Sequence, residues 1–313
     1  MFVLFKKRDF SSYISDTFSF LKLFGKHFFK NYFIINGGFL LILSVLLYFM
    51  IKVYFEVLFS ASGAPQGSYF QQYFDDNLGL FIGSISIFGI LIIVLSLLNV
   101  AYPIVYLELV SQKNNNDFTT ADIISLLKQN IGKLLKFFLG SIFVVLPILA
   151  IVFGIVLALC LILIGFPLLF IVAPACISWL HLSLYTYLTE ETGFIQALQE
   201  GYYLLKQKFW ANVGATFVIY MLIQVVQSFL TMIPYFIGIA AFLTSSTAPG
   251  WNTETGSSMS IFISLFFIFA ILLSYFFNNL VILNQGIIYY SLREENENLT
   301  TISEIDLIGL DNE

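Results

Sequence analysis

The feature that most constrains this chain is an apolar run from Phe137 to Thr189 that contains no Asp, Glu, Lys or Arg. As one continuous helix this run would be about 80 Å long, more than twice the ~30 Å hydrocarbon core of a bilayer. The run therefore predicts two membrane-spanning helices. The expected turn is Ile164-Gly165-Phe166-Pro167, because glycine permits turn geometry and proline begins a helix more readily than it continues one.

The rest of the chain has the same apolar character. Of its 313 residues, 59% are hydrophobic and 11% are charged, and the mean hydropathy is +0.90, which is far outside the range of soluble globular domains. The same length argument, applied to every charge-poor run, predicts an all-α membrane protein with six transmembrane helices. The expected spans lie near residues 33–59, 78–109, 137–163, 167–189, 209–243 and 259–292.

The positions of the lysines and arginines predict the orientation, because cytoplasmic loops carry an excess of these residues. When the N-terminus is placed inside, every lysine and arginine except Lys52 falls on the cytoplasmic side. We therefore expect a multi-pass protein of the bacterial cytoplasmic (inner) membrane with both termini in the cytoplasm and no removable signal peptide. The net charge of −5 comes from the tail, because residues 293–313 hold one arginine and seven carboxylates.

Three amphipathic segments, each directly before a pair of spans, give the chain an internal repeat. The predicted units cover residues 9–109, 117–189 and 192–292, followed by an acidic cytoplasmic tail at 293–313, within a single membrane domain of residues 1–313. In each segment apolar side chains recur at helical spacing opposite polar ones. The apolar stripes are Phe10, Ile14, Phe18, Leu21, Phe24 and Phe28; Ile123, Ile124, Leu127, Ile131 and Leu134; and Phe194, Leu198, Tyr202, Leu205 and Phe209.

These helices are too polar to cross a membrane and suit its cytoplasmic interface, where apolar side chains enter the acyl boundary and lysines meet anionic headgroups. The alternative is that the segments only cover the cytoplasmic ends of the bundle. The candidate contacts to anionic lipid headgroups are Lys22, Lys26, Lys30, Lys133, Lys136, Lys206 and Lys208.

Local signals refine the expected ends of the helices. Thr119 and Asp122 have the spacing of a capping box, and Ser11 or Ser12 is the expected cap of the first amphipathic helix. The even-numbered spans end alike, with tyrosines that we expect to be interfacial anchors and carboxylates that we expect to pair with lysines of the amphipathic helices. These endings are Tyr102, Tyr106 and Glu108; Tyr185, Tyr187 and Glu190; and Tyr289, Tyr290, Arg293 and Glu294.

The third unit and the end of the chain carry a family resemblance. The stretches FIQALQEGYYLLKQKFW, residues 194–210, and IIYYSLREENENL, residues 287–299, resemble the six-helix membrane domain that is fused to some bacterial glycerophosphodiester phosphodiesterases, and its stand-alone relatives. The resemblance implies a membrane-embedded accessory domain near lipid metabolism. It implies no catalytic residue here, because the hydrolase chemistry of the fused proteins resides in a separate soluble barrel for which this chain has no length.

The residues themselves contain no pattern of a catalytic, cofactor or metal site. His27 and His181 are far apart in the sequence, and Cys160 and Cys176 lie within apolar spans without a nearby histidine or acidic cluster. We therefore expect a protein that is not an enzyme, holds no cofactor, binds no nucleic acid, and acts as a scaffold or accessory subunit in contact with membrane lipids or a partner membrane protein.

A transporter of a lipidic or weakly polar solute is the alternative function. Amide side chains in the fifth and sixth spans are the only hint of a polar cavity, and interhelical hydrogen bonding is the other role open to them. The candidate cavity residues are Gln224, Gln227, Asn278, Asn284 and Gln285.

Overall fold

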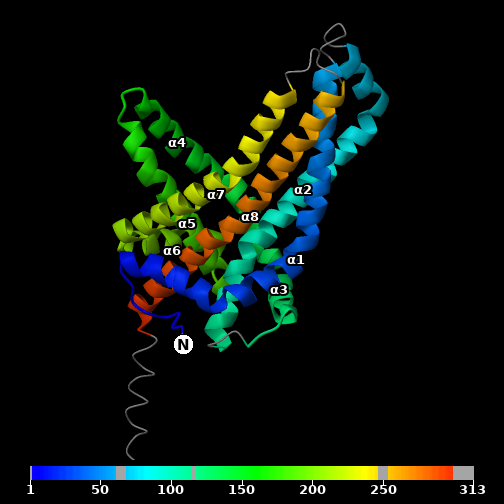
Figure 1. Ribbon diagram of the computed structural model, residues 1–313. Helices are drawn as coiled ribbons and strands as arrows, with labels where there is room; N and C mark the ends of the chain where they lie inside the picture. Colours follow the sequence, from blue (N-terminus) through cyan, green and yellow to red (C-terminus); the bar gives the residue numbers. More distant parts are fainter. Residues whose placement is uncertain (1, 61–67, 114–116, 246–252, 299–313) are drawn as a thin grey trace, which may run out of the picture. The chain divides into compact units, whose positions relative to one another are not determined.

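The computed structural model describes residues 2–60, 68–113, 117–245 and 253–298, and the regular secondary structure in these ranges is helical (Figure 1). The α-helices are α1 (Phe10–Ser60), α2 (Ser68–Lys113), α3 (Thr120–Gly140), α4 (Leu146–Cys160), α5 (Gly165–Thr189), α6 (Phe194–Gln207), α7 (Phe209–Ser245) and α8 (Thr253–Glu297), and a π-helical segment, η1 (Ser141–Val145), joins α3 to α4. Six helical stretches of the described chain are long and apolar enough to cross a membrane. The expectation of six helices that are long and apolar enough to span a membrane is therefore confirmed.

The amphipathic segments differ in how they connect to the spans that follow them. The first is continuous with its span in α1, and the second reaches its span through η1. Pro147 explains η1, because its ring lacks an N–H and clashes with the carbonyl of the preceding turn, so the backbone before it widens. Only the third segment, α6, is a separate helix, which ends at Lys208 in a non-helical conformation (φ −128°, ψ 52°).

Two helix starts test the capping signals in the sequence. At α3 the capping box is confirmed, because the Thr119 N–H donates to Asp122 Oδ2 (2.8 Å) and the Asp122 N–H donates to Thr119 Oγ1 (3.4 Å). At α1 the expectation of a serine cap is wrong. The helix begins at Phe10, so Asp9 occupies the cap position, and its carboxylate accepts the Ser12 N–H (2.8 Å). Hydrogen bonds from the Ser12 side chain and backbone lower the pKa of Asp9.

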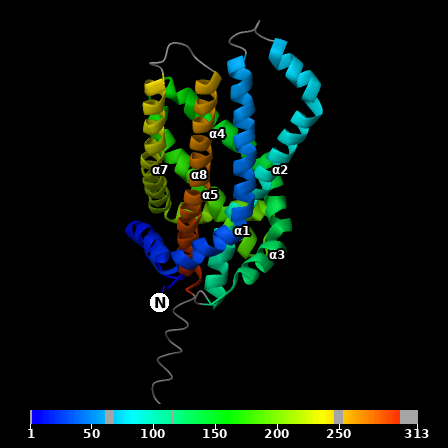
Figure 2. The ribbon, with the colours of Figure 1, turned by 45° about the vertical axis from the view of Figure 1, so that its right-hand side comes forward.

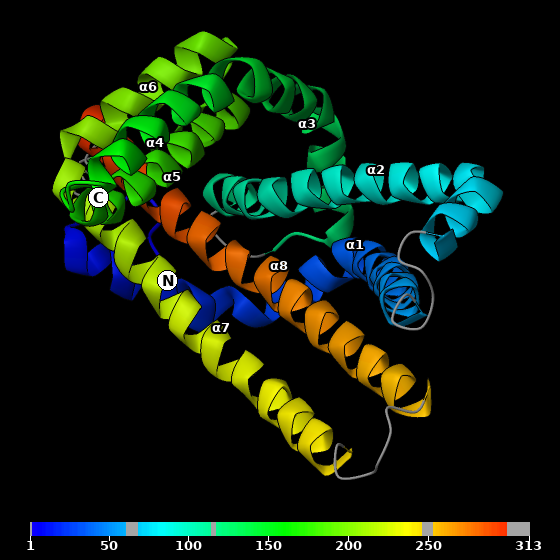
Figure 3. The same ribbon diagram turned by 90° about the horizontal axis from the view of Figure 1, so that it is seen from above.

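The described chain divides into two compact units that are not successive in sequence. The first unit contains Met1–Ile35, Leu97–Leu222 and Asn278–Glu313, and the second contains Asn36–Ser96 and Ile223–Phe277. Because α1, α2, α7 and α8 each contribute to both units, every predicted repeat supplies part of the first unit. In the second unit α7 and α8 run side by side (Figures 2 and 3), and Gln227 Nε2 of α7 donates to Ser274 Oγ of α8 (2.6 Å).

The core of the first unit lies where the last turns of α2, α5 and α8 meet. Residues 101–107, 182–188 and 281–292 are buried without interruption. A Cβ atom at Gly286 of α8 would lie 2.2 Å from Leu107 Cδ1 of α2 and 2.4 Å from the Tyr185 hydroxyl oxygen of α5. Glycine at this position therefore allows three helices to approach one another. The Tyr185 hydroxyl donates to the Ile282 carbonyl (2.9 Å), which joins α5 to α8.

The tyrosines at these helix ends belong to this core. Tyr102, Tyr106, Tyr185 and Tyr289 are fully buried, so the expectation that they are interfacial anchors is wrong. Their hydroxyls find partners inside the protein, as when Tyr102 donates to the Phe28 carbonyl of α1, and the rings then add apolar contact area to the core.

The amphipathic segments cover this core, and α6 packs against α5 with α3 beside both (Figure 3). Each apolar stripe divides into a buried and an exposed part. Phe24 and Phe28 of α1 are buried, whereas Phe10 and Phe18 are 43% and 45% exposed. The same division holds in α3 and α6, where Ile131 and Tyr202 are each 53% exposed. The stripes therefore serve packing, and they also leave apolar side chains on the surface.

The contact between α5 and α6 gives a test of this packing. A Cβ at Gly201 of α6 would lie 2.1 Å from Ser183 Oγ and 2.6 Å from the Ser183 backbone nitrogen of α5. We predict that Gly201→Ala lowers the free energy of unfolding by about 1–3 kcal/mol, because the two backbones must separate. Unfolding in mixed micelles titrated with sodium dodecyl sulfate measures this change. Gly132→Ala is the matched control, because its Cβ meets no atom within 4 Å and alanine favours a helix.

Candidate functional site

Three lysines form an exposed row on the first-unit part of α1. Lys22, Lys26 and Lys30 repeat every fourth residue, which places them along one side of the helix, and the ion pairs found among the described residues involve other side chains. Apolar side chains accompany them, because Leu23 and Phe33 are 61% and 51% exposed. We call Lys22, Lys26 and Lys30 the lysine row. Its mixture of ammonium groups and apolar side chains is typical of helices in a membrane interface.

The other four candidate lysines fall into two groups. Lys136 and Lys206 are exposed, like the lysine row. Lys133 is half-buried and donates to the Glu190 carbonyl (3.5 Å), and Lys208 donates to the Arg8 carbonyl (2.9 Å). Five of the seven sequence candidates are therefore exposed, whereas Lys133 and Lys208 have intramolecular partners.

Aromatic side chains on and after α6 add to the exposed surface. Tyr202, Tyr203 and Trp210 are 53%, 64% and 71% exposed, close in sequence to Lys206. Tyrosine and tryptophan are enriched at headgroup level because one end of each ring is apolar and the other is polar. The opposite side of α6 is fixed to the core, where Leu198, Gly201 and Leu205 are buried.

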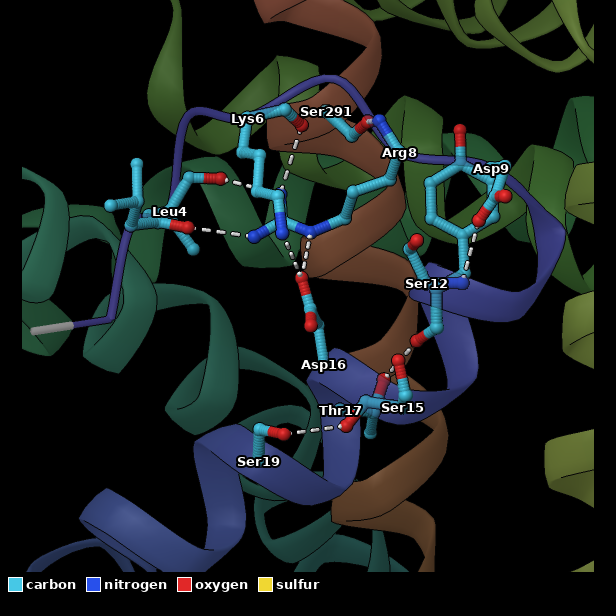
Figure 4. A network of polar contacts seen from close by, with 12 residues as sticks. Leu4, Lys6, Arg8, Asp9, Ser12, Ser15, Asp16, Thr17, Ser19 and Ser291 are labelled. Atoms are coloured by element: carbon cyan, nitrogen blue, oxygen red, sulfur yellow. Dashed lines mark hydrogen bonds and ion pairs between the residues drawn. The ribbon is translucent and has the colours of Figure 1, made fainter.

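A buried arginine next to α1 is the part of the site that sequence reasoning missed. Arg8 is 3% exposed, although its position in the sequence groups it with cytoplasmic surface cations. Its guanidinium donates to the carbonyls of Val3 (2.7 Å), Leu4 (2.7 Å) and Lys6 (3.1 Å) and to the Asp16 carboxylate (2.8 Å), as Figure 4 shows. Burial lowers the pKa of Arg8, and the hydrogen bond and charge of Asp16 oppose that shift. We call these five residues the Arg8 cluster.

The Arg8 cluster connects the N-terminal segment to helix ends far away in the sequence. The Arg8 N–H donates to Ser291 Oγ of α8 (3.0 Å; Figure 4). Lys208, just before α7, donates to the Arg8 carbonyl (2.9 Å) and pairs with Glu295 of α8. The segment thus joins the starts of α1 and α7 to the end of α8. No spacing rule predicts a carbonyl shell of this kind, because backbone conformation forms it.

The five candidate cavity residues have different surroundings. Asn284 and Gln285 are fully buried in the first unit, where Asn284 Nδ2 donates to the Tyr13 carbonyl (3.1 Å) and Thr17 Oγ1 (3.0 Å), and Gln285 Nε2 donates to Thr216 Oγ1 (2.7 Å). These bonds join α8 to α1 and α7, which is the interhelical role. Asn278 is half-buried in the same unit, whereas Gln224 and Gln227 belong to the second unit, Gln224 exposed and Gln227 half-buried.

Glu190, at the end of the fourth span, has a different partner from the amphipathic-helix lysine that the sequence predicted. Glu190 pairs with Arg293 (3.1 Å) and accepts the Tyr289 hydroxyl (2.8 Å), so the end of α5 is joined to the end of α8. Arg293 Nη2 also donates to both oxygens of Glu297 (2.7 and 2.9 Å). Glu108, by contrast, lies within electrostatic range of Lys133, a lysine of an amphipathic helix.

The histidines make structural contacts. His27 Nδ1 lies 2.8 Å from the Tyr106 hydroxyl, and His181 Nδ1 lies 2.7 Å from the Ile177 carbonyl. Within the described residues, no three histidine, cysteine or acidic side chains are grouped to hold a metal ion.

No protein-family model, curated protein or solved structure matches the chain. The resemblance to the membrane domain of glycerophosphodiester phosphodiesterases stays a prediction.

The Arg8 cluster gives the second test. In Arg8→Gln, the shorter neutral side chain leaves carbonyls of the N-terminal segment and the Asp16 carboxylate without their donor, and each unsatisfied buried group costs about 1–3 kcal/mol. We predict that residues 2–9 detach locally, so that their amide hydrogens exchange faster and proteases cleave this segment sooner. Lys7→Gln is the control, because that exposed side chain makes one hydrogen bond, to Asn298. Equal exchange in the two variants would contradict a structural role of Arg8.

Proposed function

We propose that this chain is a non-enzymatic scaffold or accessory subunit of the bacterial cytoplasmic membrane, whose three amphipathic segments lie in the cytoplasmic interface and bind anionic lipid headgroups. Both termini then lie in the cytoplasm. The observation that carries this proposal is the lysine row, three exposed ammonium groups on one side of α1 beside exposed apolar side chains. Such a surface gains both from charge attraction to anionic lipids and from burial of apolar area in the acyl boundary.

The fixed inner side of the same helices supports the proposal. The first-unit part of α1 is held by bonds from α2 and α8, and α6 is held against α5 at Gly201. Lysines on a fixed helix bind headgroups without first ordering the backbone, which lowers the entropy cost of binding. The resemblance to a membrane domain near lipid metabolism agrees with a lipid ligand. The interhelical hydrogen bonds of Asn284 and Gln285 give these residues a packing role, so transport is not part of the proposal.

The test replaces Lys22, Lys26 and Lys30 together by glutamine. Each lysine near an anionic surface contributes about 1 kcal/mol, so the triple variant should lose on the order of a hundredfold in affinity for phosphatidylglycerol at low salt. Nanodiscs of phosphatidylcholine with increasing phosphatidylglycerol, and mass spectrometry of the retained lipids, measure this preference.

The matched control replaces the same three lysines by arginine, which keeps the charges. This variant should retain the lipid preference, and added salt should weaken it in the wild type and in the control alike. An unchanged phosphatidylglycerol preference in the glutamine variant would contradict the proposal, as would a preference that does not respond to salt.

A further inference from the structure

The turn between α4 and α5 has no polar side chain. Leu161, Ile162, Leu163 and Ile164 are 88%, 60%, 73% and 56% exposed (the turn at the end of the green hairpin in Figure 1). Every residue from Ile142 to Ile177 lacks a charged, hydroxyl or amide side chain. In sequence, the connections of the other two hairpins contain Ser62 and Gln66 in one case and Ser246, Thr247 and Asn252 in the other. The second hairpin therefore lacks the polar loop that a water-exposed turn normally has.

The backbone of this turn pairs its own donors. The N–H groups of Leu161, Ile162 and Leu163 donate to the carbonyls three residues earlier, at 3.2, 3.2 and 3.0 Å. Pro167, two residues into α5, has no N–H. Hydrocarbon contains no water to satisfy a free N–H, so a turn there must satisfy its donors internally. This turn meets that requirement at three consecutive residues.

Two residues show what kind of environment the turn suits. Leu163 has a positive φ of 64°, a conformation that glycine or asparagine adopts at much lower cost in a turn facing water. The side chain of Leu163 is 73% exposed on the protein, so an apolar environment around the turn lowers its free energy by removing that apolar surface from water. At Gly165 a Cβ would lie 2.3 Å from the Val156 carbonyl oxygen and 2.4 Å from the Cys160 nitrogen. The two helices thus meet closely, and the end of the hairpin is narrow.

The length of α5 limits how far the hairpin reaches. Trp179 Nε1 donates to the Leu198 carbonyl of α6 (2.9 Å), and Gly201 of α6 contacts Ser183, so α5 passes α6 at Trp179 to Ser183. From Gly165 to these two positions α5 is about 21 to 27 Å long, which is less than the ~30 Å hydrocarbon core. Any tilt of the helix shortens the reach across the membrane further.

The third hairpin contains a longer helix. Helix α7 begins at Phe209, directly after α6, and its 37 residues extend about 55 Å. That length exceeds the hydrocarbon core, and its following connection is polar. The contrast arises within one chain, so it does not depend on the thickness chosen for the bilayer.

From these observations we infer that the α4–α5 hairpin ends inside the hydrocarbon core, and that residues Leu161 to Ile164 contact the acyl chains of the leaflet opposite to α6. This inference rests on the proposed function in one respect, the placement of α6 in the cytoplasmic interface. The composition of the turn, its internal hydrogen bonds and the leucine at positive φ support an acyl-chain partner independently of that placement. The second repeat is then a hairpin without an exposed loop on the far side.

Spin labels measure the depth of the turn. A label at Ile162→Cys, in a background of Cys160→Ala and Cys176→Ala, is placed in vesicles of phosphatidylcholine and phosphatidylglycerol, and power saturation compares collisions with oxygen and with the water-soluble complex NiEDDA. We expect frequent collisions with oxygen and rare collisions with NiEDDA. The reference is a label at Ser257→Cys near the start of α8, which should collide with NiEDDA several times more often because its surroundings in the sequence are polar.

A third label separates the two proposals. Tyr203→Cys on the exposed side of α6 should report a depth near the headgroups if α6 is interfacial. A label at Ile162 that collides with NiEDDA as often as the label at Ser257 overturns the hydrocarbon placement of the turn. If the label at Tyr203 is fully in water, the placement of α6 in the interface is contradicted. If the label at Ile162 is still inaccessible to NiEDDA in that case, the placement of the turn in hydrocarbon remains supported.

A label at Leu161→Cys provides a second, independent position in the turn, which controls for any change in the turn caused by the substitution at Ile162. Leu161 is the most exposed residue of the turn at 88%, and its side chain should tolerate a label without loss of packing. The same low accessibility to NiEDDA at both positions is the expected result. High accessibility at both positions excludes an acyl-chain environment.

Discussion

The first unit depends on the close approach of three helix ends at Gly286. Leu107 of α2 and Tyr185 of α5 both come so near to this glycine that a single added carbon would meet them at 2.2 and 2.4 Å. The even-numbered spans therefore share one contact point, although they are separated by most of the chain. The amphipathic segments then have a fixed surface to cover, and the positions of their lysines follow from that packing.

Polar groups hold this core together because a membrane protein gains little from hydrophobic association between its helices. Tyr185 bonds the Ile282 carbonyl, and Asn284 bonds the Tyr13 carbonyl and Thr17. Each bond joins segments far apart in sequence and satisfies a group that would otherwise be costly in an apolar surrounding. The Arg8 cluster follows the same principle at the N-terminus, where carbonyl oxygens and one carboxylate receive a buried guanidinium.

The three predicted repeats meet at buried helix ends in the core of the first unit, and their helices differ in length away from that core. Each of the three predicted repeats contributes a buried helix end to the core. The helices also differ in length, since the 37 residues of α7 extend about 55 Å, whereas α5 extends about 27 Å from Ser183 to Gly165. In the proposed placement, a lysine-bearing interfacial surface on one side is combined with an apolar hairpin end in the opposite leaflet. The protein then contacts lipid headgroups and acyl chains through different repeats.

The sequence by itself determined the six apolar helices and the capping box of α3, because each depends on the length of an apolar run or on residues within one turn. It placed the turn of the second hairpin at residues 164–167, three residues after the observed turn at 161–164, because Gly165 and Pro167 begin α5. It also identified five exposed lysines, since helical spacing places them opposite the buried stripe, but it grouped with them Lys133 and Lys208, which have intramolecular partners. Tertiary structure alone decided that the tyrosines of the even-numbered spans are core residues, that Arg8 is buried, and that Asn284 and Gln285 bond to α1 and α7. The physical reason is that these outcomes depend on partners more than sixty residues away in the chain, or on backbone carbonyls whose direction the side-chain sequence does not specify.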